Sequence, residues 1–141
     1  MTTRPPYRPA PGGPKGPGLG HVLCVEDDPV VQYMLGDIIR TAGGQYCPAA
    51  SAREAEDLLD DGRFDLVLLD RRLPDSDGLL LLHTIKRKSD CPVIVLTAMD
   101  EARDKILGLG LGAAHYVTKP FNPAELSSRV RSILADRERR R

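Results

Sequence analysis

A short apolar run that ends in a carboxylate places the strongest constraint on the fold. The segment begins at Phe64, continues through Leu66–Leu69 and ends at Asp70, and the charged, turn-forming loop Arg71–Gly78 follows. A run of this length and composition is typical of a parallel strand that is buried on both faces. In open α/β folds, the carboxyl ends of such strands form the sheet edge where ligands bind. Asp70 is therefore expected at a ligand site.

The composition of the chain excludes several kinds of protein. The chain of 141 residues is long enough for one domain with a substantial core, and 20 basic residues balance 20 acidic ones. A neutral chain of this kind is not expected to bind nucleic acid directly, and its apolar runs are too short for a membrane span or a signal segment. The odd number of separated cysteines, Cys24, Cys47 and Cys91, indicates reduced thiols in a cytoplasmic protein.

The chain is expected to divide into three parts. Residues 1–20 are rich in proline and glycine and contain little to bury, so we expect a disordered leader. Residues 21–136 form the folded domain, and residues 137–141 form a basic C-terminal tail. A proline-rich leader can also dock on an aromatic groove, but no clear recognition motif supports that alternative here.

Within the domain, apolar runs alternate with helical patterns. Strands are predicted at 21–25, 45–50, 64–70, 92–97 and 116–118, and helices at 30–41, 51–61, 78–88, 100–111 and 122–135. Such alternation predicts a doubly wound α/β fold with a parallel sheet of five strands and with five helices. Because Pro48 cannot donate to a strand ladder, the second strand belongs at an edge. This favours the flavodoxin-like strand order 2-1-3-4-5.

Acidic residues are expected to meet where the first and third strands end. In this order the two strands are neighbours, so Glu26 and Asp27 should lie close to Asp70. Three carboxylates at short range repel each other unless their pKa values rise or a cation lies among them. Oxygen ligands without histidine or cysteine favour Mg²⁺.

The other strand ends add a hydroxyl group, Thr97, and an ammonium group, Lys119. Around a carboxylate and a cation, these groups can stabilise the charge on the oxygens of a transferring phosphoryl group. Asp70 is therefore a candidate nucleophile that accepts a phosphoryl group as an acyl phosphate.

Taken together, these motifs resemble the receiver domain of two-component response regulators. The resemblance covers residues 21 to about 135. It rests on Val25–Asp28, Leu68–Gly78, Leu96–Ala98 and Tyr116–Phe121, in this order and after the expected strands.

The resemblance implies a role for each acid at the site. It makes Asp70 the phosphorylation site and Asp27 a direct Mg²⁺ ligand. Glu26 would act on the metal largely through water, and the backbone carbonyl of Arg72 would be the remaining protein ligand. Asp28 does not match a ligand position, so we expect it to favour the start of the first helix through the helix dipole.

Three further positions also follow from the resemblance. Thr97 and Lys119 would bind the phosphoryl oxygens, and the Lys119–Pro120 peptide bond would be cis. Tyr116 matches the aromatic switch residue that turns inward when Thr97 moves toward the phosphoryl group.

The leading hypothesis is a phosphorelay switch. A sensor histidine kinase or a phosphotransfer protein would phosphorylate Asp70, and the surface of the fourth helix, fifth strand and last helix would then control a partner or a transcriptional output domain. Such a domain catalyses part of its own phosphorylation and dephosphorylation without being an enzyme in the ordinary sense.

Homodimerisation through this surface is a related expectation. The residues that fit the salt bridges of the winged-helix regulator subgroup are Lys105, Glu125, Arg129 and Arg131. Ala114 and His115, however, occupy positions where that subgroup usually has aspartates.

Two alternative functions remain open. A Mg²⁺-dependent phosphatase with an aspartyl-phosphate intermediate would need a second acid two residues after the nucleophile, where this chain has Arg72. A degenerate receiver would act as a binding scaffold without phosphorylation. A flavodoxin-type phosphate binder is disfavoured because the acids after the first strand would repel phosphate.

Overall fold

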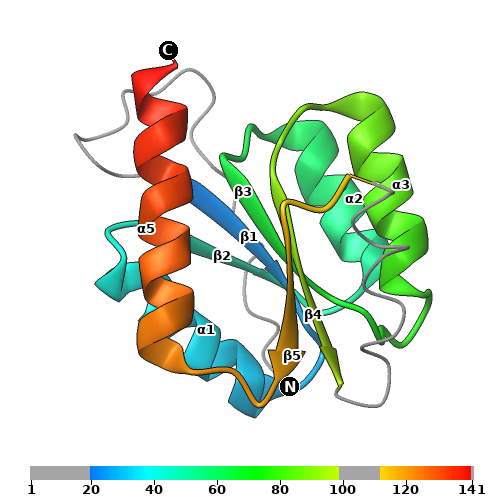
Figure 1. Ribbon diagram of the computed structural model, residues 1–141. Coiled ribbons are helices and arrows are strands. Elements are labelled where there is room, and N and C mark those ends of the chain that lie inside the picture. The colour runs from blue at the N-terminus through cyan, green and yellow to red at the C-terminus, as the bar shows by residue number, and fades with distance from the viewer. Residues whose placement is uncertain (1–19, 99–111, 141) are drawn as a thin grey trace.

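The computed structural model describes residues 20–98 and 112–140, and this part of the chain contains one parallel sheet (Figure 1). The strand order is β2-β1-β3-β4-β5, so the predicted order is confirmed. The strands are β1 (His21–Val25), β2 (Gln45–Ala49), β3 (Leu66–Asp70), β4 (Val93–Ala98) and β5 (His115–Lys119). The helices are α1 (Pro29–Thr41), α2 (Ala52–Asp61), α3 (Gly78–Lys88) and α5 (Pro123–Arg139).

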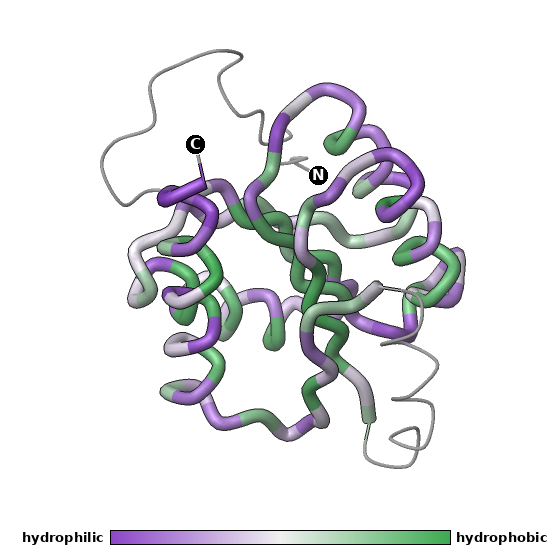
Figure 2. Tube along the Cα trace, turned by 45° about the horizontal axis from the view of Figure 1, so that its top comes forward, coloured by the Kyte–Doolittle hydropathy of each residue, from purple (hydrophilic) through white to green (hydrophobic). Residues whose placement is uncertain are grey.

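Helices cover both faces of the sheet. In Figure 1, α1 and α5 lie on one face, and α2 and α3 lie on the other. Successive strand residues face opposite sides: Leu23 and Val25 pack in one apolar cluster, whereas Val22 and Cys24 pack in the other. Figure 2 shows the resulting hydrophobic band through the centre of the molecule. Burial on both faces explains why the strands are continuous apolar runs rather than alternating ones.

The helices begin at capping residues, several of which the sequence predicts. Asp28 Oδ1 accepts a hydrogen bond from the Val30 amide at 2.9 Å, so Asp28 caps α1 directly. Ser51 Oγ accepts from the Glu54 amide at 3.1 Å, as the predicted capping box requires. The return bond, at 3.3 Å, runs from the Ala50 amide to Glu54, one residue before the cap.

Some boundaries differ from those predicted. β3 begins at Leu66 rather than Phe64, and α5 continues to Arg139, so most of the predicted basic tail is the last part of a helix. Arg137 forms an ion pair with Asp90 at 3.6 Å, which ties this end of α5 to the segment before β4. The predicted helix 100–111 and residues 1–19 of the predicted leader lie outside the described residues. Within the part of the chain that is described, no helix is long and apolar enough to cross a membrane.

Candidate functional site

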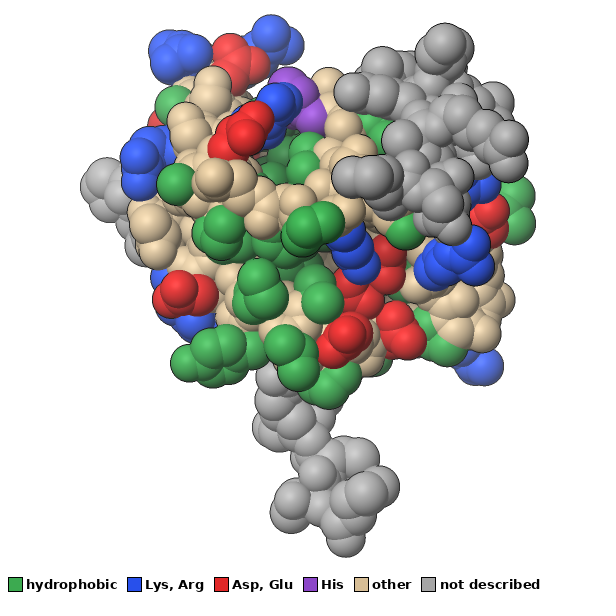
Figure 3. All heavy atoms as spheres, turned by 60° about the horizontal axis from the view of Figure 1, so that its bottom comes forward, with side chains coloured by type: hydrophobic (Ala, Val, Ile, Leu, Met, Phe, Trp, Pro, Cys, Tyr) green, Lys and Arg blue, Asp and Glu red, His purple; other side chains and the backbone are tan. Residues whose placement is uncertain are grey.

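Three acidic residues meet at the carboxyl edge of the sheet. β1 and β3 are parallel neighbours with Val25 beside Leu69, so Glu26 and Asp27 leave the sheet next to Asp70. One carboxylate oxygen from each of the three lies within 4.8 Å of the others. Figure 3 shows this edge of the molecule, where acidic side chains gather beside an apolar surface. The acidic cluster predicted from the sequence is therefore present.

Lys119 joins this acidic cluster from β5. Its Nζ lies 2.9 Å from Glu26 Oε1 and 3.3 Å from Asp70 Oδ1. β4 separates β5 from β3, so only a long side chain can bridge the strands. The Lys119–Pro120 peptide bond is cis, as the resemblance implied.

Burial and charge shift the pKa values of two groups here. The Glu26 side chain is only 1% exposed, and this burial is the main cause of its raised pKa. The nearby Asp70 carboxylate also raises the pKa of Glu26, while the bond from Lys119 lowers it. Burial by itself would lower the pKa of the Lys119 ammonium, but its bonds and charge interactions with Glu26 and Asp70 outweigh burial and raise it. The lysine therefore stays charged and compensates the acids.

The donor set fits a hard divalent cation. Its side-chain donors are carboxylate oxygens, without histidine or cysteine, and Mg²⁺ prefers a small number of such ligands together with water or phosphate oxygens. Asp27 is exposed, which suits a direct ligand of the metal. Glu26 is buried, which suits a group that acts on the metal through water.

The loop after β3 packs closely against Asp70. The Arg72 amide lies 3.4 Å from Asp70 Oδ1, and the Gly78 amide donates to the Arg71 carbonyl at 2.6 Å. A Cβ atom at Gly78 would collide with the Asp70 carbonyl oxygen and lie 2.8 Å from Arg71 Cα. Glycine is therefore required at this position by a close approach of two backbone segments.

Thr97 and Tyr116 lie on β4 and β5, on the side of the sheet away from β1. Thr97 is fully buried, and its Oγ1 lies 3.4 Å from the Ala98 carbonyl oxygen. Thr97 pairs with Thr118, the residue before Lys119, so the hydroxyl and ammonium groups come from adjacent strand ends. Tyr116 is 6% exposed, and its hydroxyl has no hydrogen-bond partner among the residues that the structure describes.

Two residues near the site have contacts that sequence patterns did not reveal. Gln32 contacts the ends of β1 and β2 from α1. Asp75, in the loop after β3, accepts from the Ala52 and Arg53 amides at the start of α2, at 2.9 and 3.0 Å. In both cases the partners are remote in sequence. The only local signal is that Gln32 lies at the border of the apolar face of α1.

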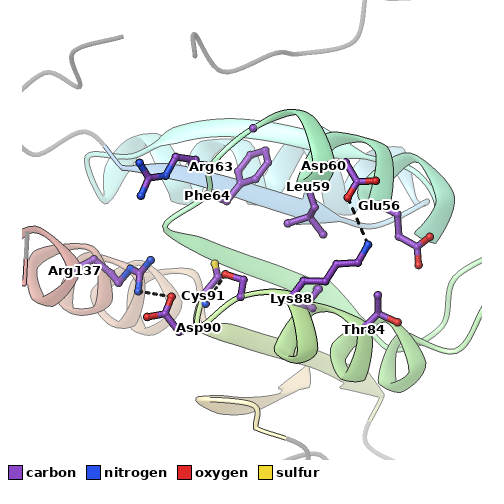
Figure 4. Close-up of a pocket in the computed structure, with 13 residues that line it drawn as sticks. Glu56, Leu59, Asp60, Arg63, Phe64, Thr84, Lys88, Asp90, Cys91 and Arg137 are labelled. Atoms are coloured by element: carbon purple, nitrogen blue, oxygen red, sulfur yellow. Dashed lines mark hydrogen bonds and ion pairs between the residues drawn. The ribbon is translucent and has the colours of Figure 1, made fainter. Parts of the chain in front are cut away.

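A separate cleft of about 380 Å³ lies near the opposite edge of the sheet, between α2 and α3. Phe64 and Cys91, which precede β3 and β4, contribute to its lining. Figure 4 shows two ion pairs at this cleft, Lys88 with Asp60 and Arg137 with Asp90. Because Asp70 lies at the other end of β3, the cleft is not part of the acidic site.

Comparison with known proteins establishes the family. The profile of the response regulator receiver domain matches residues 22–131. The chain belongs to the response-regulator receiver family. Receiver domains of this family are signalling modules and not enzymes in the ordinary sense.

Similar receiver proteins include a full-length regulator and two solved domains. Transcriptional regulatory protein BasR of Escherichia coli (strain K12) is 43% identical over 114 residues, which are 80% of this chain and 51% of BasR. The receiver domain of Francisella response regulator 1452 has a TM-score of 0.77 and 31% identity, over 83% of this chain and 98% of that domain. The BeF3-activated receiver domain of Klebsiella pneumoniae RstA has a TM-score of 0.75 and 32% identity, over 81% of this chain and 97% of that domain. The chain spans about half the length of the curated relatives it matches.

Proposed function

We propose that this receiver is a Mg²⁺-dependent phosphorylation switch that accepts a phosphoryl group on Asp70. The observation that carries the proposal is the meeting of Asp70 with two further acids and with Lys119 at one sheet edge. The donor would be a phosphohistidine of a sensor histidine kinase or a phosphotransfer protein. Membership in the receiver family favours this switch over the phosphatase alternative.

The chemistry is a displacement at phosphorus. A carboxylate oxygen of Asp70 forms the new P–O bond while the P–N bond of phosphohistidine breaks, and the bonding electrons leave with the imidazole. A Mg²⁺ ion held by Asp27, Asp70 and the Arg72 carbonyl, with Glu26 acting through water, would neutralise charge on the phosphoryl oxygens.

The residues on β4 and β5 would respond to the new phosphoryl group. The Lys119 ammonium lies 3.3 Å from Asp70 Oδ1, close enough to move from the carboxylates to a phosphoryl oxygen. The Thr97 hydroxyl would turn toward another oxygen, and Tyr116, which is already buried here, would repack into the space that Thr97 leaves. The last two movements are the proposed switch, and the same site would support slow self-dephosphorylation.

An exposed apolar surface beside the acids supports a protein donor. Val30 and Tyr33 are 67% and 81% exposed, and Met34 is also partly exposed, in the first turns of α1 after Asp27. Large exposed apolar groups next to a reactive centre are typical of a surface that another protein covers. A protein that buries this surface could bring a phosphohistidine to Asp70.

The proposed output surface consists of β5, α5 and the predicted helix 100–111, which lies outside the described residues, and it would control either a homodimer or an output domain. Because BasR is a transcriptional regulator, we propose a transcriptional output. Within this chain, Arg129 lies 3.2 Å from Glu125 Oε1 and 2.9 Å from His115 Nδ1, and Arg131 donates to the Thr41 carbonyl at 2.9 Å. A dimer that used these arginines would have to exchange such contacts for contacts with a second chain.

Substitution of the acceptor tests the proposal. With acetyl phosphate and Mg²⁺, we expect the intact mass of the native protein to increase by one phosphoryl group and that of Asp70→Asn to stay unchanged. Because Asn lacks the nucleophilic oxygen and removes one repelling charge, the variant should fold at least as stably as the native protein.

The outcomes separate the alternatives. Phosphorylation of Asp70→Asn at the native rate and stoichiometry would show that Asp70 is not the acceptor. If the native protein gains no phosphoryl group from acetyl phosphate or from a phosphohistidine donor, the chain is a degenerate receiver that acts as a scaffold.

A further inference from the structure

Gln32 connects α1 to the strand ends that position the acids. Its side-chain amide nitrogen, Nε2, lies 2.8 Å from the Cys24 carbonyl oxygen, 2.9 Å from the Glu26 carbonyl oxygen and 3.1 Å from the Ala49 carbonyl oxygen. These carbonyl groups belong to the next-to-last residue of β1, to the first residue beyond β1 and to the last residue of β2. One partly buried side chain therefore holds the point where the chain leaves the sheet.

Tyr46 holds the other end of this amide. Its hydroxyl donates a hydrogen bond to Gln32 Oε1, so the amide oxygen faces a donor and the amide nitrogen faces only acceptors. If the amide were reversed, Oε1 would lie against three carbonyl oxygens, none of which can donate a hydrogen bond. The network therefore specifies one orientation of the Gln32 side chain.

The position of Tyr46 depends on two other residues of α1. A Cβ atom at Gly36 would lie 3.2 Å from Tyr46 Cε2, so glycine leaves the space that the ring needs. The Arg40 guanidinium carbon lies 5.5 Å from the centre of the same ring. Gln32, Gly36 and Arg40 are spaced by four residues and share one helix face, which fits against Tyr46 on β2.

The Glu26 carbonyl is the contact that reaches the site. This carbonyl belongs to the peptide group that joins Glu26 to Asp27, and a planar peptide group moves as one unit. Holding the carbonyl oxygen therefore restricts the direction in which both side chains leave the backbone. The Glu26 amide is also held, because it donates to the Ala49 carbonyl at 2.9 Å.

We propose that Gln32 is a positioning residue, which acts through the Glu26–Asp27 peptide group to set the affinity of the acidic cluster for Mg²⁺. The inference rests on the proposed function, because it concerns the same metal site. Gln32 does not contact the reacting groups in this role, so it should affect the binding of Mg²⁺ more than the chemistry once Mg²⁺ is bound.

Calorimetric titration with Mg²⁺ alone tests this role. Gln32→Met keeps the length of the side chain but can neither donate to the carbonyl groups nor accept from Tyr46. We expect its Mg²⁺ affinity to fall about tenfold, at the lower end of the range for groups that orient metal ligands. Tyr46→Phe should cause a smaller loss in the same direction, since it frees the amide without removing it.

A rate measurement separates positioning from general damage. With acetyl phosphate, Gln32→Met should need more Mg²⁺ for half-maximal phosphorylation but approach the native rate at saturating Mg²⁺. The matched control is Gln45→Met, the same change at the opposite end of β2, which should bind Mg²⁺ like the native protein. If the control loses as much affinity as Gln32→Met, the positioning role is wrong.

The other possible results distinguish failure of this inference from failure of the proposed function. Native Mg²⁺ affinity in a folded Gln32→Met variant would overturn the inference and leave the proposed function intact. If the native protein itself binds no Mg²⁺, the proposed function fails first. If Gln32→Met does not fold, Tyr46→Phe decides the question, and unchanged affinity in that variant would contradict the inference.

Discussion

At the scale of single residues, the site is a balance between buried acids and one lysine. The Glu26 side chain is 1% exposed and lies 2.9 Å from Lys119 Nζ. A buried carboxylate is costly unless a cation or hydrogen bonds compensate it. Lys119 supplies this compensation, and under the proposed function the same ammonium group would move to a phosphoryl oxygen.

Replacement of Lys119 should therefore destabilise the fold in a pH-dependent way. We expect Lys119→Met to lower the free energy of unfolding at neutral pH by about 2 kcal/mol, less than for a fully buried pair because the lysine is partly exposed. A carboxyl group whose folded pKa is raised weakens the fold when it is ionised. The loss should thus shrink as the pH falls through the raised pKa of Glu26.

Urea denaturation at neutral and mildly acidic pH measures this effect. Lys88→Met is the matched control, because Lys88 and Asp60 are 57% and 64% exposed in their 3.4 Å ion pair. Exposed pairs contribute little, so the control should change stability only slightly and without this pH dependence. Equal losses in the two variants would show that Glu26 does not depend on Lys119.

At the scale of elements, the loop after β3 is attached to a neighbouring helix as well as to its own strand. The Asp75 carboxylate accepts hydrogen bonds from two amides at the start of α2, at 2.9 and 3.0 Å. These amides are the principal cause of the lowered pKa of Asp75. The contact connects α2 to the loop that carries Arg72, and thus to one side of the acidic site.

Asp75→Asn should lower the melting temperature at neutral pH, because the amide group loses the charge interaction and one of the two acceptor oxygens. A carboxyl group with a lowered folded pKa contributes stability above its unfolded pKa, and this contribution disappears as the pH falls through the folded pKa. The difference between native and variant melting temperatures should therefore decrease in acid.

Melting curves recorded from neutral to acidic pH provide the measurement. Asp57→Asn, at an exposed position of α2, is the control and should melt like the native protein throughout. A difference between Asp75→Asn and the native protein that stays constant at all pH values would mean that the Asp75 charge does not stabilise the start of α2.

At the scale of the whole molecule, the acidic site and the surface of β5 and α5 are two separate regions. The acids lie at the carboxyl edge, and Arg129 extends from α5 toward His115 on β5. Lys119 connects them, because it is the last residue of β5 and contacts Asp70. Under the proposed function, a change at Asp70 would reach the surface of β5 and α5 through this one strand.

Solution size tests whether this surface forms a dimer. With Mg²⁺ and beryllofluoride, we expect the native protein to shift from monomer to dimer in analytical ultracentrifugation. Asp70→Asn is the control and should remain monomeric, because it lacks the acceptor oxygen. Modification without a change in size would contradict homodimerisation and favour a receiver that acts on a different partner.

The sequence alone was sufficient for the sheet and for most of the candidate site. The apolar runs, Pro48 and the helix caps predicted the strand order, and the polar residues at the strand ends predicted the meeting of Glu26, Asp27 and Asp70. These inferences succeed because the spacing of apolar residues, the helix caps and the strand ends are all local properties of the sequence. The predicted end of the domain was less accurate, since α5 includes residues 137–139.

Only the tertiary structure revealed the contacts of Gln32, Asp75 and Lys119. Lys119 was predicted to lie at the site, but its bond to Glu26 depends on how far a flexible side chain reaches across β4. Gln32 and Asp75 find partners up to 17 and 23 residues away, in segments that folding brings together. Local patterns report which face or end of an element a residue occupies, whereas a hydrogen bond between elements depends on their packing. For that reason the sequence determined which groups form the site, and the tertiary structure decided which residues hold them in position.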